Sequence, residues 1–394
     1  MSSRSREELR VVACLFFILF MGVADSQVLS PLLAAIRAQF GKSSSDMGIL
    51  FTGYSFSAGL SVLIWGPLSD VLGRKSGLLH GLIVFFAGSL VSFIATDFYI
   101  LLAGRALTGM GASILSLNCI SYAADFFPYT KRGWAMGSIF SSYFAALILG
   151  VPIGSWIGDR FGWNWVFFSM GGISVVLLFF THRFLPRLDI TLMAFKPKPA
   201  VCVQQYIGFI KSRSSLAALM SSLFASAGIM GFLAFLGIWL HDAFKIPGSK
   251  VGLVFLVCGA TALLASPIAG SISDRVGKRV QFVASCIFLA LFLFVLPGMR
   301  WGPALFGVFG MISIAAAFRQ GPMEAVLSEI APSESRGSFV ALKNSFSQLG
   351  IGLATLFSGI LFEINGYGAV CILCAVSNVL AAVCMLFTLK VRHL

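Results

Sequence analysis

Apolar stretches long enough to cross a membrane recur along the whole chain, and most of the polar breaks between them are only a few residues long. A helix that crosses the hydrocarbon core of a bilayer needs about 20 consecutive, mostly apolar residues. Charged residues make up 11% of the chain, whereas a soluble domain carries about 25%. The bilayer is therefore the main solvent of this chain, and we predict an all-α integral membrane protein.

The polar breaks divide the chain into about twelve predicted transmembrane helices. Their approximate spans are 11–33, 47–69, 77–96, 98–125, 133–157, 163–183, 217–241, 250–272, 280–297, 302–329, 337–362 and 367–389. One longer break contains Pro186, Pro197 and Pro199, which indicates a linker. The predicted domains are an N-terminal six-helix bundle at 1–183, a cytoplasmic linker at 184–216 and a C-terminal six-helix bundle at 217–394.

Positive charge is distributed unevenly between the two predicted sides of the membrane. With an even number of crossings, both termini and the linker share one side with 19 Lys and Arg residues, and the loops opposite carry six. Positively charged loops stay in the cytoplasm, so we expect both termini there. The net charge of +13 is then a topology signal, and nucleic acid is excluded as a partner.

The N-terminal segment and the absence of several motifs exclude further classes of protein. The first apolar run lacks a small-residue cleavage site, which favours a retained helix over a signal peptide. The cysteines show no metal-ligand spacing, and no phosphate-binding loop indicates ATP as an energy source. We expect no metal, no cofactor and no enzymatic activity. Short outer loops without an Asn-x-Ser/Thr sequon favour a bacterial inner membrane.

The two predicted bundles are copies of one another. An offset of 204 residues aligns Gly66, Asp70 and Gly73 with Gly270, Asp274 and Gly277, aligns Pro128, Arg132 and Gly133 with Pro332, Arg336 and Gly337, and aligns Gly162 with Gly366. Agreement in one register over so long a segment indicates a duplication with both copies in the same orientation. Parallel repeats of this kind place the substrate path between the halves, near the membrane midplane.

The loop after the second predicted helix carries the most specific motif, GPLSDVLGRK at 66–75. Its glycines allow a tight turn, and its acid can accept hydrogen bonds from a neighbouring helix N-terminus. Its basic residues can pair with that acid or with lipid phosphates. The motif resembles the signature loop of the major facilitator superfamily almost residue for residue. This resemblance implies a gate formed by Gly66, Asp70, Gly73, Arg74 and Lys75, with Asp274 in the second copy; a turn with topological charge is the alternative.

The fourth predicted helix buries Arg105 within GRALTGMGA at 104–112. An arginine at this depth is costly unless it faces a partner or a wet cavity. Asp25 on the first predicted helix lies at a similar depth and is the expected partner. A nearby cation favours the charged carboxylate and burial favours the neutral acid. A change that disturbs the pair could therefore make Asp25 release or capture a proton. The segment resembles the superfamily's fourth-helix arginine motif, linked in antiporters to proton coupling; a static ion pair is the alternative.

The tenth predicted helix carries Arg319, Gln320 and Glu324 around a Gly-Pro step. The repeat aligns Arg319 with Leu115 and Glu324 with Ile120, so neither charge belongs to the shared scaffold. An arginine suits an anionic or carboxylate-bearing group, and the glutamate could neutralise it, bind a cation or carry a proton. We expect these three residues to contact substrate, with an interhelical clamp as the alternative.

Further candidates lie in helices that line the cavity in proteins of the resembled fold. Weaker substrate-binding candidates are Asn118, Tyr143, Trp239, Asn344 and Gln348. In the fifth predicted helix, Gly150, Gly154 and Gly158 form a four-residue ladder that allows close helix packing. This ladder partly resembles the fifth-helix motif of drug:proton antiporters, although Val151 precedes Pro152 where those antiporters have glycine.

The sequence therefore predicts a secondary transporter that works by alternating access. The preferred function is proton-coupled efflux of a small amphipathic or anionic organic compound by a monomer in the lipid bilayer. Proton-coupled uptake of a small organic acid or nutrient is the first alternative. A lipid flippase or scramblase is the second.

Overall fold

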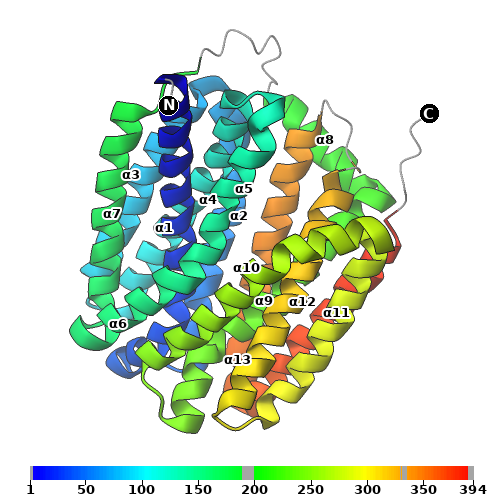
Figure 1. The fold of residues 1–394 in the computed structure, drawn as a ribbon. Helices are drawn as coiled ribbons and strands as arrows, with labels where there is room; N and C mark the ends of the chain where they lie inside the picture. Colours follow the sequence, from blue (N-terminus) through cyan, green and yellow to red (C-terminus); the bar gives the residue numbers. More distant parts are fainter. Residues whose placement is uncertain (1–2, 189–198, 329, 331–334, 389–394) are drawn as a thin grey trace.

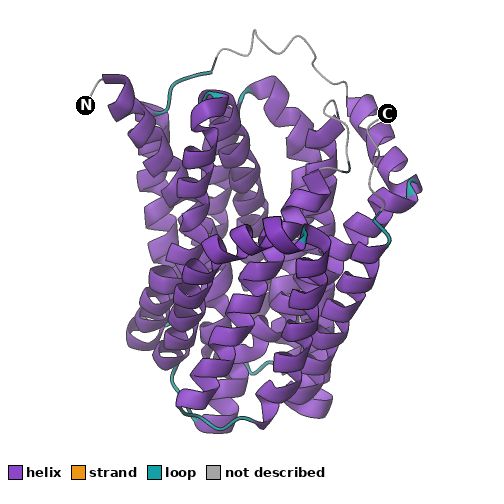
Figure 2. Ribbon diagram, turned by 45° about the vertical axis from the view of Figure 1, so that its right-hand side comes forward, coloured by secondary structure: helices purple, strands orange, loops and turns teal. Residues whose placement is uncertain are grey.

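The computed structural model describes residues 3–188, 199–328, 330 and 335–388 of the chain. Within these ranges the side chains of residues 3–5, 70, 129, 199–203, 328 and 336 are not described. The described residues are almost all helical and contain no strand (Figure 2).

The first half of the chain folds into six membrane-spanning segments. They are α1 (Ser3–Phe40), α2 (Ser44–Leu72), α3 (Arg74–Phe93), α4 (Phe98–Phe126), the continuous run of α5 (Tyr129–Ala145), a π-helical turn (Ala146–Gly150) and α6 (Val151–Phe161), and α7 (Trp163–Phe184). Pro152 at the start of α6 has no N–H to donate, so the π-helical turn lies where the regular hydrogen-bond ladder is interrupted.

The second half begins within the predicted linker. Its elements are α8 (Pro199–Lys211), α9 (Arg213–Phe244), α10 (Gly248–Val276), α11 (Lys278–Val295), a 3-10 turn (Leu296–Gly298), α12 (Pro303–Ser328) and α13 (Arg336–Leu386). The helix predicted from residue 217 therefore starts four residues earlier, at Arg213, after a separate helix that the linker composition did not predict.

Eleven described helical segments are long and apolar enough to cross a membrane, and the last, Gly337–Leu386, contains 50 residues. At about 1.5 Å per residue such a helix would be about 75 Å long, more than twice the hydrocarbon thickness of about 30 Å. Gly366 interrupts it with non-helical angles (φ 73°, ψ −174°). Since α13 therefore contains two crossings, the predicted all-helical membrane fold with about twelve crossings is confirmed.

The duplication is visible in the backbone of the turns. Gly73 and Gly277 have φ of 90° and 99°, and Gly162 and Gly366 have φ of 104° and 73°. Each pair is separated by the 204-residue offset of the sequence repeat. A positive φ is strained for a residue with a side chain, so glycine is required where each half turns from one helix to the next.

The two halves lie side by side (Figure 1), with the start of α1 and the end of α7 on one face, here called the terminal face, and the opposite side called the far face. Contacts between the halves are made by α2 with α13, α6 with α10, and α1 with α9. The hydrogen bonds between described residues of the two halves lie toward the far face. Examples are Thr52 Oγ1 to the Gly352 carbonyl at 2.9 Å and Arg37 Nη2 to Asp242 at 2.7 Å. The far face is therefore closed.

Candidate functional site: a buried ion pair between two bundles

Asp25 on α1 and Arg105 on α4 form an ion pair in the interior of the first half. Arg105 Nη1 donates to Asp25 Oδ1 at 3.0 Å, and the side chains are 1% and 0% exposed. Burying both charges is unfavourable unless they compensate each other. The predicted pairing is present, and its role in proton coupling stays a prediction.

Two aromatic rings enclose the guanidinium group of Arg105. Its central carbon lies 4.9 Å from the ring centroid of Tyr54 on α2 and 5.2 Å from that of Phe167 on α7. Cations are attracted to aromatic faces, more strongly when water is excluded. Arg105 thus connects α1, α2, α4 and α7. We did not predict Tyr54 or Phe167, because nothing distinguishes them in sequence among 39 Phe and 7 Tyr residues.

The ion pair leaves one polar atom of each partner without a hydrogen bond. Among the described residues, Asp25 Oδ2 and Arg105 Nε are buried and have no hydrogen-bond partner. A buried unsatisfied polar atom is costly and rare in folded proteins. A proton on the unpaired carboxylate oxygen would remove the negative charge without first breaking the bond to the other oxygen.

The glycine ladder of the fifth span packs α1 against the π-helical turn and α6. A methyl group added at Gly150, Gly154 or Gly158 would collide in turn with Ala24, Val28 and Leu32 of α1. These contacts begin next to Asp25 and continue toward the far face. The predicted packing role of the ladder is therefore confirmed, and it fixes the position of the carboxylate-bearing helix.

Arg319 on α12 lies inside the second half and is 2% exposed. Nη1 donates to Asn378 Oδ1 at 2.5 Å, and Nη2 donates to the Ala225 carbonyl at 2.8 Å. The Cys286 thiol of α11 lies within electrostatic range of the guanidinium group. The two hydrogen bonds join α12 to α9 and α13, the geometry of the interhelical clamp. Direct contact of Arg319 with a substrate would require them to open.

Glu324, four residues after Gln320 on α12, pairs with Lys343, which was not among the predicted site residues. Lys343 Nζ on α13 lies 2.8 Å from Glu324 Oε1 and 2.9 Å from Oε2, and Gln320 Nε2 donates to Oε1 at 3.3 Å. The Glu324 side chain is 47% exposed and that of Lys343 is 10% exposed. This cluster presents both signs of charge on the accessible side of α12 and α13.

Tyr143 on α5 of the other half is 39% exposed. The carboxylate of Glu324 lies within electrostatic range of its hydroxyl group. Of the predicted substrate residues, the structure therefore places Gln320 and Glu324 in contact, with Tyr143 within electrostatic range of the glutamate.

The other predicted substrate residues lie elsewhere. Asn118 is fully buried, donates to the Ile114 carbonyl at 2.8 Å and packs against α3. Trp239 stacks on Tyr367 at 4.5 Å between ring centroids, near the far face. Asn344 and Gln348 are half-buried on α13, and Gln348 faces Gly59 of α2 at the contact between the halves.

The predicted gating loop joins α2 to α3 at the terminal face. Arg74 donates to Asp125 Oδ2 at 3.0 Å and to Ser69 Oγ at 2.6 Å. Lys75 donates to the His182 carbonyl in the last turn of α7 at 2.8 Å and to the Leu185 carbonyl just after that helix at 2.6 Å. Gly66 lies close to Ala341 of α13 across the two halves.

The structure does not show how the two acids of the predicted gate, Asp70 and Asp274, take part in closing it. The side chain of Asp70 lies outside the described residues, so its proposed contact with a helix N-terminus is not tested. Asp274, its counterpart in the second half, is exposed at the end of α10. Gly73 supplies the turn with its positive φ.

Two repeated bundles that are closed on one face and carry charged residues in their interior define a membrane transporter. The family model of the Major Facilitator Superfamily matches residues 15–239 and 218–393. The chain belongs to this superfamily, a family of transporters and not of enzymes.

Its relatives and structural neighbours support this assignment over nearly the full length. The chain is 29% identical over 378 residues to the uncharacterized MFS-type transporter YwfA of Bacillus subtilis, covering 94% of this chain and 90% of that protein. The structure is similar to that of a D-xylose–proton symporter, with TM-score 0.77 and 19% identity over 98% of each chain. It is also similar to the human organic anion transporter MFSD10, with TM-score 0.72 and 17% identity over 96% of this chain and 99% of that one.

Proposed function

We propose that the chain is a proton-coupled secondary active transporter that exports a small amphipathic or anionic organic compound by alternating access. The Asp25–Arg105 ion pair, buried and incompletely hydrogen bonded, is the observation that carries this proposal. In the proposed arrangement the protein is a monomer of the bacterial inner membrane, its terminal face is cytoplasmic, and the bundles at 1–183 and 217–394 rock about the linker.

Coupling follows from the geometry of the ion pair. With Asp25 ionised, Arg105 ties α4 to α1. Protonation at Oδ2 neutralises the carboxylate and weakens this tie, leaving Arg105 between its two aromatic rings. Because α1 also contacts α9 of the second half, a change in how α1 is held alters the contact between the halves. The proton thus biases which face is open.

The proposed substrate region lies between the halves, toward the terminal face. Tyr143 contributes a hydroxyl group from the first half, and Glu324 with Lys343 contributes both charges from the second. The lysine attracts an anionic group, while the glutamate must be displaced or protonated for the anion to bind closely. We assign Arg319 and Asn118 to support of this region, and Asn344 and Gln348 to the sliding contact between α13 and α2.

Two gates complete the proposed cycle. On the far face, Arg37 and Asp242 hold α1 to α9. On the terminal face, the loop at 66–75 with Asp70 closes against the second half when the far face opens. The same ion pair drives uptake if substrate binds the protonated state first, so the sign of the proton flux decides the direction.

Proton flux in proteoliposomes tests the proposal. The purified protein is reconstituted with a pH-sensitive dye inside, and p-aminohippurate, ethidium and D-xylose are tested as an anion, an amphipathic cation and a neutral solute. We expect a gradient of the anion or the cation to drive proton movement in the opposite direction. Asp25→Asn should abolish this flux but retain exchange of labelled substrate, since exchange does not require net proton transfer.

The matched control is Asp97→Asn. Asp97 caps α4 through the backbone N–H groups of Tyr99 and Ile100, and asparagine caps as well as aspartate, so this variant should transport like wild type. Proton flux in the same direction as the substrate would show symport, and uptake would then replace efflux as the proposed function. Full proton flux in Asp25→Asn, or movement of none of the three probes, would contradict the proposal.

A further inference from the structure

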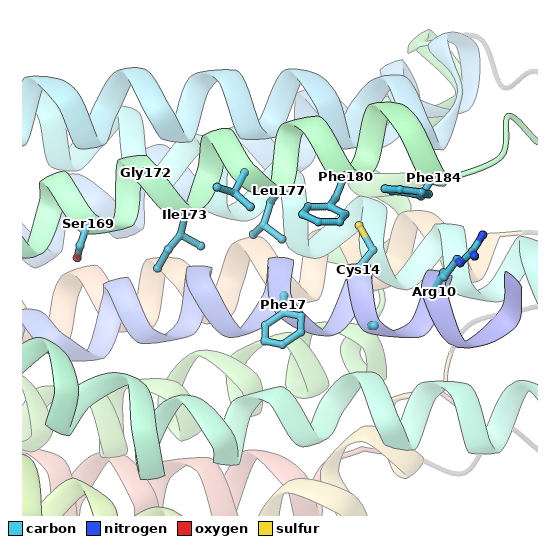
Figure 3. Close-up of a pocket in the computed structure, with 11 residues that line it drawn as sticks. Arg10, Cys14, Phe17, Ser169, Gly172, Ile173, Leu177, Phe180 and Phe184 are labelled. Atoms are coloured by element: carbon cyan, nitrogen blue, oxygen red, sulfur yellow. The ribbon is translucent and has the colours of Figure 1, made fainter. Parts of the chain in front are cut away.

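A lateral groove lies between α1 and α7 on the outer surface of the first half (Figure 3). It encloses about 830 Å³. Its walls are Phe17 of α1 and Ile173, Leu177, Phe180 and Phe184 of α7. Several of these side chains are strongly exposed, for instance Phe17 at 53%. The groove is therefore an apolar surface in contact with the surroundings of the protein.

The groove faces the bilayer and not the space between the halves. Contacts between the halves are made on the first side by α1, α2, α5, α6 and the π-helical turn, whereas α7 packs on α3, α1 and α6 of its own half. A hydrogen bond between the Cys14 thiol and the Thr181 hydroxyl group, with 3.4 Å between Sγ and Oγ1, joins α1 to α7 at the base of the groove. The occupant must therefore come from the lipid phase.

The dimensions of the groove fit one leaflet. On α7 it extends from Ser169 to Phe184, which at 1.5 Å per residue is about 22 Å. One leaflet contributes about 15 Å of hydrocarbon, and about 20–22 Å together with its headgroup region. An acyl chain can lie along the groove from the polar interface at the terminal face to the middle of the membrane.

The terminal end of the groove is cationic. The guanidinium carbons of Arg10 and Arg183 lie 5.8 and 5.5 Å from the ring centroid of Phe184, and both side chains are exposed. Glu7 is the nearest exposed acid in sequence, since Glu8 is ion paired with Lys131 at 2.8 Å. Two guanidinium groups beside one apolar channel match a phosphate group attached to an acyl chain.

We propose that this groove binds an anionic phospholipid of the leaflet at the terminal face, with one acyl chain along α7 and its phosphate between Arg10 and Arg183. The bound lipid holds α1 against α7. Asp25 lies three helical turns beyond Cys14 on α1, so the lipid also acts on the helix that carries the buried carboxylate. This binding site does not depend on proton coupling or on the identity of the substrate.

Photo-crosslinking in nanodiscs tests this site. The probe is phosphatidylglycerol with a diazirine on its acyl chain, in a phosphatidylcholine bilayer, and crosslinked peptides are mapped by mass spectrometry. We expect crosslinks on α1 and α7 within the groove. Unlabelled phosphatidylglycerol should compete much better than phosphatidylcholine or oleate.

Two substitutions separate the acyl site from the phosphate site. A side chain added at Gly172 meets nothing within 4 Å, so Gly172→Leu should fold normally, fill the groove and reduce crosslinking at least fivefold. Gly307→Leu on α12, which also has open space, is the matched control and should leave crosslinking unchanged. Arg10→Gln with Arg183→Gln should retain crosslinking but lose the headgroup preference, about fivefold for each basic residue.

Three results of the crosslinking experiment would contradict the proposed lipid site. Equal competition by phosphatidylcholine, or no effect of the arginine substitutions, would show ordinary boundary lipid and overturn the proposal. Competition by oleate as strong as that by phosphatidylglycerol would identify a fatty-acid site. Crosslinking that Gly172→Leu does not reduce would place the lipid outside the groove.

Discussion

Gly237 on α9 allows the far face to close. A methyl group added there would collide with the backbone carbonyl of Ser30 on α1. The Ser30 hydroxyl accepts a hydrogen bond from the Gly237 N–H at 3.3 Å and donates to the Leu233 carbonyl. The two helices belong to different halves, so this collision exists only while the far face is closed. Gly237→Ala should therefore favour the conformation in which that face is open.

The size of the effect follows from the cost of overpacking. Inserting a methyl group into a well-packed contact costs about 1–3 kcal/mol. A difference of 1.4 kcal/mol changes an equilibrium constant about tenfold, so the ratio of closed to open molecules should fall by a factor between about 5 and about 150. Spin labels can be attached at Ala38→Cys and Ala243→Cys, both exposed near the far face. Double electron–electron resonance should show a longer distance between the two labels in the Gly237→Ala variant.

Gly350→Ala provides the matched control. Its added methyl would collide with the Leu223 carbonyl, but Gly350 on α13 and Leu223 on α9 lie in the same half. This variant should lose stability without changing the distance between the labels. Unchanged distances in a folded Gly237→Ala protein, or an equal change in Gly350→Ala, would refute the argument that the glycine acts through closure.

Three further predictions concern the charged groups. Asp25→Asn and Arg105→Gln should each lower the free energy of unfolding, measured by titration with dodecyl sulfate, by about 3–5 kcal/mol. The double variant should recover most of the lost stability, because no buried charge is then left without its partner. Losses that add up in the double variant would contradict the interpretation that the two residues act as one pair. Asp242→Asn should lengthen the same label distance slightly and remove its salt dependence, because its pair with Arg37 is partly exposed and contributes only about 0.5 kcal/mol; an unchanged salt dependence would count against this latch. Arg319→Met should lower thermal stability while substrate exchange continues at the same affinity, and weaker substrate binding at normal stability would instead place Arg319 in the substrate site.

The sequence contained enough information to predict the fold because each level of the pattern pointed the same way. Span length and the turn glycines are local properties that the bilayer and the backbone enforce directly. The repeat shows that both halves share them. The Asp25–Arg105 pair was predictable for a related reason. Each is the only charged residue in the middle of its apolar helix, and equal depth leaves few other partners.

Partners in the second half could not be predicted from depth alone. Arg319 and Glu324 are close in sequence, but five residues turn a helix by about 500°, which leaves their side chains about 140° apart. One therefore points into the bundle toward Asn378, while the other reaches Lys343. Helix rotation decides such contacts, and it is set by packing against neighbouring helices. Lys343 was missed because it lies near the start of its helix, where a lysine is easily taken for an interfacial charge.

The neutral partners of Arg319 have an electrical consequence. Among the described residues, its hydrogen-bond partners are an amide and a carbonyl, so the second half keeps a positive charge inside the membrane, whereas Asp25 and Arg105 sum to zero. The membrane potential then exerts a force on one half and almost none on the other. Moving a unit charge across the whole membrane at 100 mV involves about 2.3 kcal/mol, so a shift through a tenth of the thickness involves only about 0.2 kcal/mol. A strong dependence of transport rate on voltage would therefore come from the charge of the substrate and the proton, while the resting protein would respond only weakly.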